Sequence, residues 1–183
     1  MGQAKKPRPV KLFLGMITAN EILLAQVEKI MSYKFGRIDF ESPVLPFFYT
    51  THYQREMGQN LKRKFITFEQ LIDPGQIAEI KALTNQVEKE FLEANSGKRK
   101  INLDPGYLSS SKLILVTTKN YFHRIYLSQG IYAEITLRFV RNKGFQPWEW
   151  TYPDYRSESY LKIFNEMRRR YQEQLRQMER GIQ

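Results

Sequence analysis

The chain has 183 residues, no cysteine, and 29 lysine and arginine residues against 19 aspartate and glutamate residues, for a formal net charge of +10. The lack of cysteine excludes disulfides, thiolate catalysis and cysteine-ligated metal sites, and it favours a reducing compartment, for which we take the cytoplasm. The basic start has no apolar segment long enough for a signal peptide, and no apolar run approaches a membrane span. We therefore expect no membrane partner.

The length suits one domain. The predicted division is a mobile basic arm over residues 1–9 and a single α+β domain over residues 10–183. The arm is predicted to be mobile because it holds two prolines and three cations without hydrophobic periodicity. The net charge attracts polyanions such as nucleic acid, although a charge of this size also serves solubility alone.

The first predicted strand covers residues 11–17, which are almost entirely apolar. Thr18 and Glu21 have the spacing of a capping box, so a helix is predicted to begin there. Apolar residues follow at helical spacing, and Gly36 offers a stop. Residues 37–41 then alternate between polar and apolar types, which predicts a half-buried strand.

A second strand–helix–strand pattern follows. Residues 62–69 alternate again and predict a strand. The sequence of residues 73–76, Asp-Pro-Gly-Gln, is typical of a helix start with proline at the first helical position. A strand is predicted to begin over residues 98–103, a turn at residues 104–106, and another buried strand over residues 112–117.

This order, β-α-β-β-α-β, predicts a ferredoxin-like antiparallel sandwich with two helices on one face. Residues 123–127 and 131–140 add a C-terminal β-hairpin around residues 128–130, and residues 142–144 turn the chain again. A long C-terminal helix is predicted over residues 157–180, where apolar residues recur on one stripe. The predicted class is therefore α+β.

The candidate functional residues gather around the predicted hairpin. The candidate proton-transfer groups are Asp104, His123 and Glu134. The candidate ligand-binding groups in the same cluster are Tyr107, Lys112, Lys119 and Arg124. This composition suits an anion or sugar-phosphate site. It also suits a purely structural role, with a cross-strand Glu134–Arg124 pair and an aspartate that caps its own turn.

Strand alternation sets a limit on this cluster. Neighbouring residues of a strand point to opposite faces, so only one of His123 and Arg124 is predicted to line the face that Glu134 lines. Arg124 is the better partner for Glu134, because that choice leaves Ile125 in the core.

An aromatic segment over residues 148–156 supplies two further candidate ligand-binding residues, Tyr152 and Arg156. Aromatic rings interleaved with charges can stack on bases or sugars. They can equally pack the final helix onto the sheet. The final helix has two possible roles. Its apolar stripe packs on the sheet, or it forms a homodimer interface if the sheet leaves the distal half of the helix uncovered. Many of the charges on this helix pair with one another.

Several enzymatic patterns are missing. The sequence contains no phosphate-binding loop motif, no dinucleotide-binding glycine motif and no G-x-S-x-G serine hydrolase motif. Its two histidines exclude a histidine-rich metal site, and neither lies in the repeated histidine motif of the two-histidine phosphoesterases. We therefore assign no metal ligands, and the sequence identifies no cofactor.

Several short motifs are distributed along the chain: Glu56-Met-Gly58, Lys62-Arg63, Asn102-x-Asp104-Pro-Gly-Tyr-Leu108, Thr117-Thr-Lys119, His123-Arg-Ile-Tyr-Leu127, Gly130-Ile-Tyr-Ala-Glu134 and Trp150-Thr-Tyr-Pro-Asp-Tyr-Arg156. In combination they closely resemble an uncharacterised prokaryotic family, domain of unknown function 4416. The resemblance covers nearly the whole chain except the basic arm and the last helical turns. It implies a cytoplasmic single-domain protein and no known activity.

The leading hypothesis is a protein that binds or processes a phosphate-bearing ligand, either RNA or a nucleotide. In a hydrolytic or transfer reaction, Asp104 or Glu134 would act as the base and His123 as the acid. The alternative is a protein–protein module that uses the C-terminal helix to dimerise or dock. The salt dependence of binding distinguishes the two hypotheses, because the affinity for phosphate falls steeply with added salt and the affinity of apolar docking does not.

Overall fold

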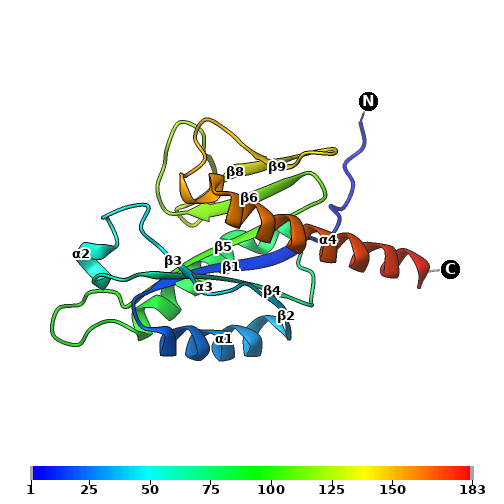
Figure 1. The fold of residues 1–183 in the computed structure, drawn as a ribbon. Coiled ribbons are helices and arrows are strands. Elements are labelled where there is room, and N and C mark those ends of the chain that lie inside the picture. Colours follow the sequence, from blue (N-terminus) through cyan, green and yellow to red (C-terminus); the bar gives the residue numbers. More distant parts are fainter. Residues whose placement is uncertain (1, 182–183) are drawn as a thin grey trace.

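The computed structural model describes residues 2–181, and its central feature is a nine-stranded antiparallel sheet (Figure 1). Seven strands lie side by side in the order β2 (Ile38–Glu41), β4 (Lys62–Phe68), β1 (Lys11–Thr18), β5 (Ile101–Leu108), β6 (Lys112–Thr117), β8 (Ile131–Val140) and β7 (Ile125–Ser128). Two short strands complete the sheet: β3 (Leu45–Pro46) pairs with β4, and β9 (Gly144–Pro147) pairs with β8.

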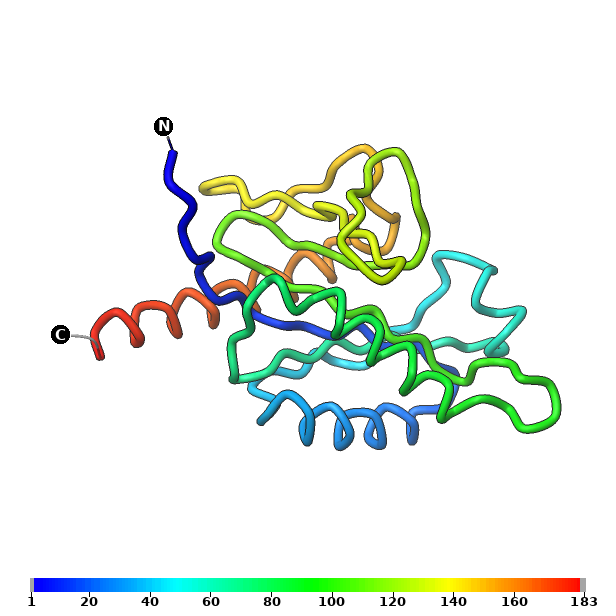
Figure 2. Tube along the Cα trace, turned by 180° about the vertical axis from the view of Figure 1, so that it is seen from behind, coloured from blue at the N-terminus to red at the C-terminus, as the bar shows by residue number. Residues whose placement is uncertain are grey.

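Helices cover both faces of this sheet. Figures 1 and 2 show α3 (Ile77–Glu90) and α4 (Glu158–Arg180) on opposite sides, and α1 (Glu21–Phe35) lies along the strands near α3. A short helix, α2 (Gln54–Met57), lies in the connection from β3 to β4, at the end of the molecule away from both termini. Two 3-10 turns, Pro74–Gln76 and Asp154–Arg156, precede α3 and α4. The predicted α+β class and C-terminal helix are confirmed.

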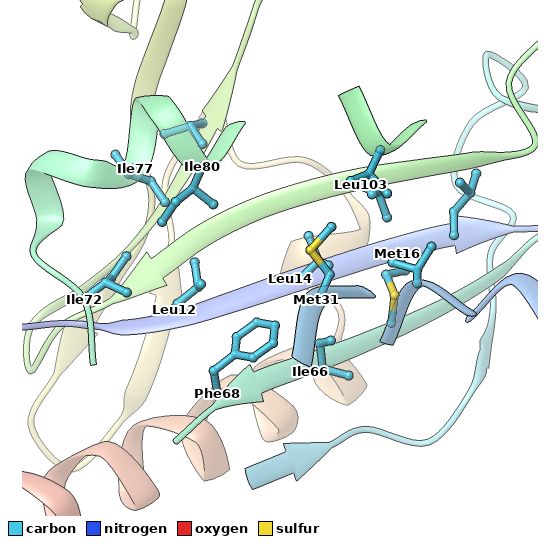
Figure 3. Close-up of a cluster of buried hydrophobic side chains, with 14 of the residues drawn as sticks. Leu12, Leu14, Met16, Met31, Ile66, Phe68, Ile72, Ile77, Ile80 and Leu103 are labelled. Atoms are coloured by element: carbon cyan, nitrogen blue, oxygen red, sulfur yellow. The ribbon is translucent and has the colours of Figure 1, made fainter. Parts of the chain in front are cut away.

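The first hydrophobic core lies between the sheet and the helices α1 and α3. Alternate residues of β1 point into it and meet apolar residues from β4, β5 and both helices; Figure 3 labels Leu12, Leu14, Met16, Met31, Ile66, Phe68, Ile72, Ile77, Ile80 and Leu103. Burying side chains of this size is the main favourable contribution to the free energy of folding. The side chains that α1 buries here are the apolar residues whose helical spacing the sequence shows.

The second core lies under α4 and is largely aromatic. Phe13 and Phe65 point to this face of the sheet and contact Phe164 of α4, with ring centroids 6.0 and 5.1 Å from that of Phe164. Because α1 and α4 sandwich β1, all eight residues of that strand are buried. The apolar stripe of α4 is buried within the chain through Tyr171, and only its last turns extend beyond the sheet (Figure 1).

The sequence predicted two capped helix starts, one at Thr18 before α1 and one at Asp73, where the 3-10 turn Pro74–Gln76 leads into α3. The capping box at Asp73 is present, with Asp73 accepting from the Gly75 amide and Gln76 accepting from the Asp73 amide. The predicted box at Thr18 is wrong, because Asn20 caps α1 through the Ile22 amide. Thr18 is instead the last residue of β1, and its hydroxyl donates to the carbonyl of Lys100.

The predicted turn at Asp104-Pro105-Gly106 is also wrong. Strand β5 runs through these residues without interruption and pairs with β1 along its whole length, from Thr18 opposite Ile101 to Lys11 opposite Leu108. Gly106 is required by close packing, because a Cβ atom there would lie 2.5 Å from the Phe13 ring and still closer to the Ile114 carbonyl.

The predicted basic arm is exposed over residues 2–8 and contains no helix or strand, while Met1 and residues 182–183 lie outside the described residues. The arm meets the end of α4, where Arg8 pairs with Glu179 at 3.5 Å and the Tyr171 hydroxyl donates to the Pro9 carbonyl. Within residues 2–181 no helix has both the length and the apolar character needed to cross a membrane.

The buried aromatic core under α4 can be tested by truncating one ring. Phe164→Ala should lower the free energy of unfolding by about 3–5 kcal/mol, because it removes a fully buried ring and leaves a cavity. The matched control is Phe122→Ala, whose ring is 93% exposed and whose loss should change stability by less than about 0.5 kcal/mol. Urea unfolding followed by circular dichroism measures both; equal losses would contradict this description of the core.

Candidate functional site

The site is created by two neighbouring strands that separate. β5 and β6 pair only over Gly106–Leu108 and Leu113–Leu115, next to their connecting turn. Beyond it, β5 continues along β1 and β6 continues along β8. The first half of β5 therefore has no strand on one side.

Side chains of α3 hydrogen-bond the backbone that β6 leaves free. The Glu88 carboxylate accepts from the Leu103 amide at 2.6 Å, and the Lys81 ammonium donates to the Leu103 carbonyl at 2.7 Å. Because backbone groups alternate along an antiparallel strand, Pro105 faces the same free side as Leu103. Proline has no amide hydrogen, so it leaves no donor unpaired there.

A pocket of about 520 Å³ opens at this separation. Residues of β4, β5, β6 and β8 contribute to it together with α3 and four connecting segments. Its charged lining residues are Arg63, Lys81, Arg99, Asp104, Lys119, Arg124, Glu134 and Asp154. The aromatic lining residues are Phe47, Tyr49, His52, Tyr53, Tyr121, Tyr152 and Tyr155.

Arg63 of β4 is the buried cation at the bottom of the pocket. Its guanidinium pairs with Asp104 at 3.1 Å and with Asp154 at 3.2 Å, and it is only 2% exposed. It crosses Gly15 of β1 to reach Asp104, and a Cβ atom on Gly15 would lie 2.7 Å from the Arg63 Nη1 atom. Gly15 therefore makes room for the pair.

The two aspartates differ in the direction of their pKa shifts. Burial favours the neutral form of Asp104, but the Arg63 and Lys81 cations outweigh it and hold the pKa of Asp104 below its usual value. For Asp154 burial prevails over Arg63, so its pKa is raised. The Asp104 carboxylate in turn raises the pKa of Tyr53, a pocket residue.

A second charged group lies on the β8 side of the pocket. Arg124 donates from Nε to Glu134 at 2.8 Å and from Nη2 to the Tyr152 hydroxyl at 2.9 Å. A third bond, from Nη1 to the Lys119 carbonyl at 2.9 Å, fixes the loop that follows β6. Glu134 is buried, and Thr136 donates to its other oxygen at 3.3 Å.

His123 contacts the same carboxylate, which corrects the prediction from strand alternation. Its Nε2 atom lies 3.1 Å from Glu134 Oε2, the oxygen that Arg124 also binds. The alternation argument fails because β7 begins only at Ile125, and residues 121–124 form a turn. Ile125, which was expected in the core, is 73% exposed.

The arrangement leaves one ring nitrogen available for proton chemistry. Glu134 accepts from Arg124, Thr136 and His123, and Asp104 is paired with Arg63. With Nε2 facing the carboxylate, the Nδ1 atom of His123 is buried and contacts no polar group of residues 2–181. His123 lines a second hollow that shares Tyr121 and Tyr152 with the pocket.

Five of the sequence-predicted site residues line the pocket together: Asp104, Lys119, Arg124, Glu134 and Tyr152. His123 lies next to them in the second hollow. Tyr107 packs against the first core, and Lys112 is exposed at the other end of β6. Arg156 donates to the carbonyls of Thr151 and Glu149 and so holds its own loop. These three residues line neither the pocket nor the second hollow.

Sequence reasoning missed Arg63, Lys81, Arg99 and Asn102, which the structure adds to the pocket. A signal for two of them was present. Arg63 lies two residues before Phe65 in a strand predicted from alternation, so it has the parity of an apolar residue and shares its buried face. Lys81 lies four residues after Ile77, on the buried side of α3. Among residues 2–181, no group of three or more histidine, aspartate or glutamate side chains could hold a metal ion.

The lowered pKa of Asp104 predicts a pH-dependent contribution to stability. A carboxyl group whose folded pKa lies below its unfolded value of about 3.9 stabilises the fold above that value. This stabilisation is lost as the pH falls through the folded pKa. Asp104→Asn should therefore destabilise the protein at pH 7, by about 1.5–3 kcal/mol for a lost hydrogen bond between charged groups.

The measurement is urea unfolding of both proteins between pH 7 and the acid limit of folding. The difference between wild type and Asp104→Asn should shrink below about pH 4. A difference that stays constant with pH would contradict an ionised, Arg63-paired Asp104.

Comparison with known proteins tests the family resemblance. Searches of curated proteins and of solved structures found no match to the chain. One family does match, and it covers residues 8–171, which include every residue of the pocket. Its description, Domain of unknown function (DUF4416), names no activity. The resemblance drawn from the sequence motifs is confirmed, and the chain belongs to the DUF4416 family.

Proposed function

We propose that the pocket binds a phosphate-bearing ligand, either a nucleotide or a residue of RNA. The observation that carries this proposal is a pair of lysines, Lys81 and Lys119, that line the pocket and form no salt bridge within residues 2–181, whereas Arg99 is paired with Glu56 and Glu88 beside the pocket. The pocket is lined by five lysine and arginine side chains and three carboxylates. All three carboxylates are paired, because Arg63 binds Asp104 and Asp154, and Arg124 binds Glu134.

Two of the cations have no carboxylate partner. Lys81 and Lys119 form no salt bridge within residues 2–181. Lys81 uses its ammonium on the Leu103 carbonyl, and Lys119 is exposed at the mouth of the pocket. A phosphate group between them would supply the missing negative charge and several acceptor oxygens.

The size and the lining of the pocket suit a nucleotide. Its volume of about 520 Å³ lies within the range of small-molecule sites. Tyrosine rings line it beside the cations, and aromatic rings can pack against sugars and bases. The side chain of Asn102 also lines the pocket, and its hydrogen bond to Asp104 helps to keep the pKa of that carboxyl low.

The alternative, a homodimer formed through α4, has less support. Tyr160, Phe164, Met167 and Tyr171 of the apolar stripe are buried in the chain's own core. Leu175 is partly buried against that core, and Met178 is 48% exposed. The area left for a partner is small compared with the 1,200–2,000 Å² or so of a typical stable interface.

We also infer that residues 11–108 form a ferredoxin-like unit. Support comes from the order β2-β4-β1-β5, in which all neighbours are antiparallel, and from the positions of α1 and α3 against one core. The separation of β5 from β6 then lies where this unit meets the C-terminal strands.

The phosphate proposal is tested by removing one positive charge. Lys119→Gln should weaken binding of ribose 5-phosphate and of bulk cellular RNA by about tenfold, because one charge-assisted hydrogen bond is lost. Lys112→Gln is the matched control: it removes the same charge from the opposite end of β6, outside the pocket. Titration calorimetry measures the affinity for ribose 5-phosphate, and gel shifts measure the affinity for RNA.

The salt dependence of RNA binding is the second readout, and the affinity should fall steeply between low and physiological salt. Absence of binding at low salt would overturn the proposal. Equal losses in the Lys112 and Lys119 variants would also overturn it, because they would assign binding to the overall charge.

A further inference from the structure

The second hollow differs in chemistry from the pocket beside it. It has a volume of about 290 Å³ and is lined by Tyr121, Phe122, His123, Glu149, Trp150 and Tyr152. Five of these six side chains are aromatic, and none is a lysine or arginine. Its one charged residue is acidic. A phosphate group is therefore disfavoured there, whereas a flat, uncharged ring is favoured.

The floor of the hollow is a fixed stack of rings. Trp150 lies nearly parallel to both His123 and Trp148, with ring centroids 5.6 and 5.2 Å from its own. The Arg138 guanidinium lies over the Trp148 ring, 4.3 Å from its centroid. The Trp150 indole nitrogen also donates to the Ile135 carbonyl at 3.0 Å. Because these contacts hold the rings in place, little side-chain entropy is lost when a ligand binds.

Two groups of the hollow are candidates for contact with a ligand: the exposed ring of Phe122, which lies edge-to-face with the His123 ring with centroids 4.9 Å apart, and one nitrogen of His123. Phe122 is 93% exposed, although its neighbour Tyr121 contacts Arg124. The Nδ1 atom of His123 is buried without a hydrogen bond, while the opposite nitrogen faces Glu134. A buried polar atom left unpaired is rare, and it indicates a missing partner. Nδ1 can accept a hydrogen bond from an N–H group of a base.

The hollow adjoins the proposed phosphate site. Tyr121 and Tyr152 line both cavities, and Glu134 of the pocket contacts His123 of the hollow. A ligand that joins a phosphate to an aromatic ring can therefore occupy both. Nucleotides have this composition, whereas sugar phosphates and phosphorylated serine residues lack the ring.

We propose that the second hollow is a subsite for an unpaired nucleobase whose phosphate binds in the main pocket. This inference rests on the proposed function and narrows its ligand to a nucleotide unit, either free or within a single strand. Phe122 would stack on the base, and the Nδ1 atom of His123 would accept one of its N–H groups. Double-stranded nucleic acid is excluded, because its bases are already stacked and paired.

The test compares three ligands on the full chain: ribose 5-phosphate, AMP and a short oligoadenylate. The first lacks a base, and the other two separate a free nucleotide from a single strand. Wild type should bind at least one base-bearing ligand more tightly than ribose 5-phosphate. Phe122→Ala should weaken that ligand by about 5- to 150-fold, the effect of losing one stacked base, and leave ribose 5-phosphate unchanged.

The matched control is Tyr33→Ala, which removes another aromatic ring that is 92% exposed, but from α1. It should leave every affinity unchanged. If all three ligands bind equally well, or if the Phe122 variant binds them as wild type does, the base subsite is overturned while the phosphate proposal stands. If none of the three ligands binds, both proposals fail.

Discussion

A buried strand edge must have its backbone hydrogen-bonded, and at β5 the neighbouring strand does not do this. β6 turns away after three residue pairs, so Leu103 would be left with an unpaired amide and carbonyl. Two charged side chains of α3 take the place of the missing strand. These bonds stabilise the separation of the two strands. The pocket that opens beside it is lined by Lys81 and by Arg99, which pairs with Glu88.

The pairing of charges in the pocket is related to the same strand separation, because the pocket contains ionised groups that are largely removed from water. An ionised group in such a position is costly unless it is paired, and Arg63, Asp104 and Asp154 pair in a buried group that crosses Gly15. Buried ion pairs contribute little net stability compared with apolar residues of similar volume. Three strands, β4, β5 and β8, each bring a charged residue to this pocket, and this placement supports the proposal that a ligand binds there.

The sequence predicted those parts of the fold that depend on local patterns. The apolar run of β1, the proline-containing cap at Asp73 and the stripe of α4 all have a local cause, and each lies where it was expected. The errors share a different cause. Asp104-Pro105-Gly106 has the composition of a turn, but it lies in a strand because β6 leaves the proline side free and Phe13 requires the glycine. His123 reaches Glu134 because β7 begins two residues later than alternation assumed. Such contacts between distant segments leave no periodic signal in one sequence.

Glu134 connects the two cavities. One of its oxygens accepts from Arg124, which faces the cationic pocket, and from His123, which lines the aromatic hollow. Since both bonds end on a single atom, the charge on Glu134 holds the arginine and the imidazole in a fixed relative position. A carboxylate that orients one imidazole nitrogen leaves the other directed elsewhere, as in sites where histidine transfers a proton or binds a ligand. Glu134, predicted as a candidate base, thus also fixes the positions of His123 and Arg124 through these two contacts.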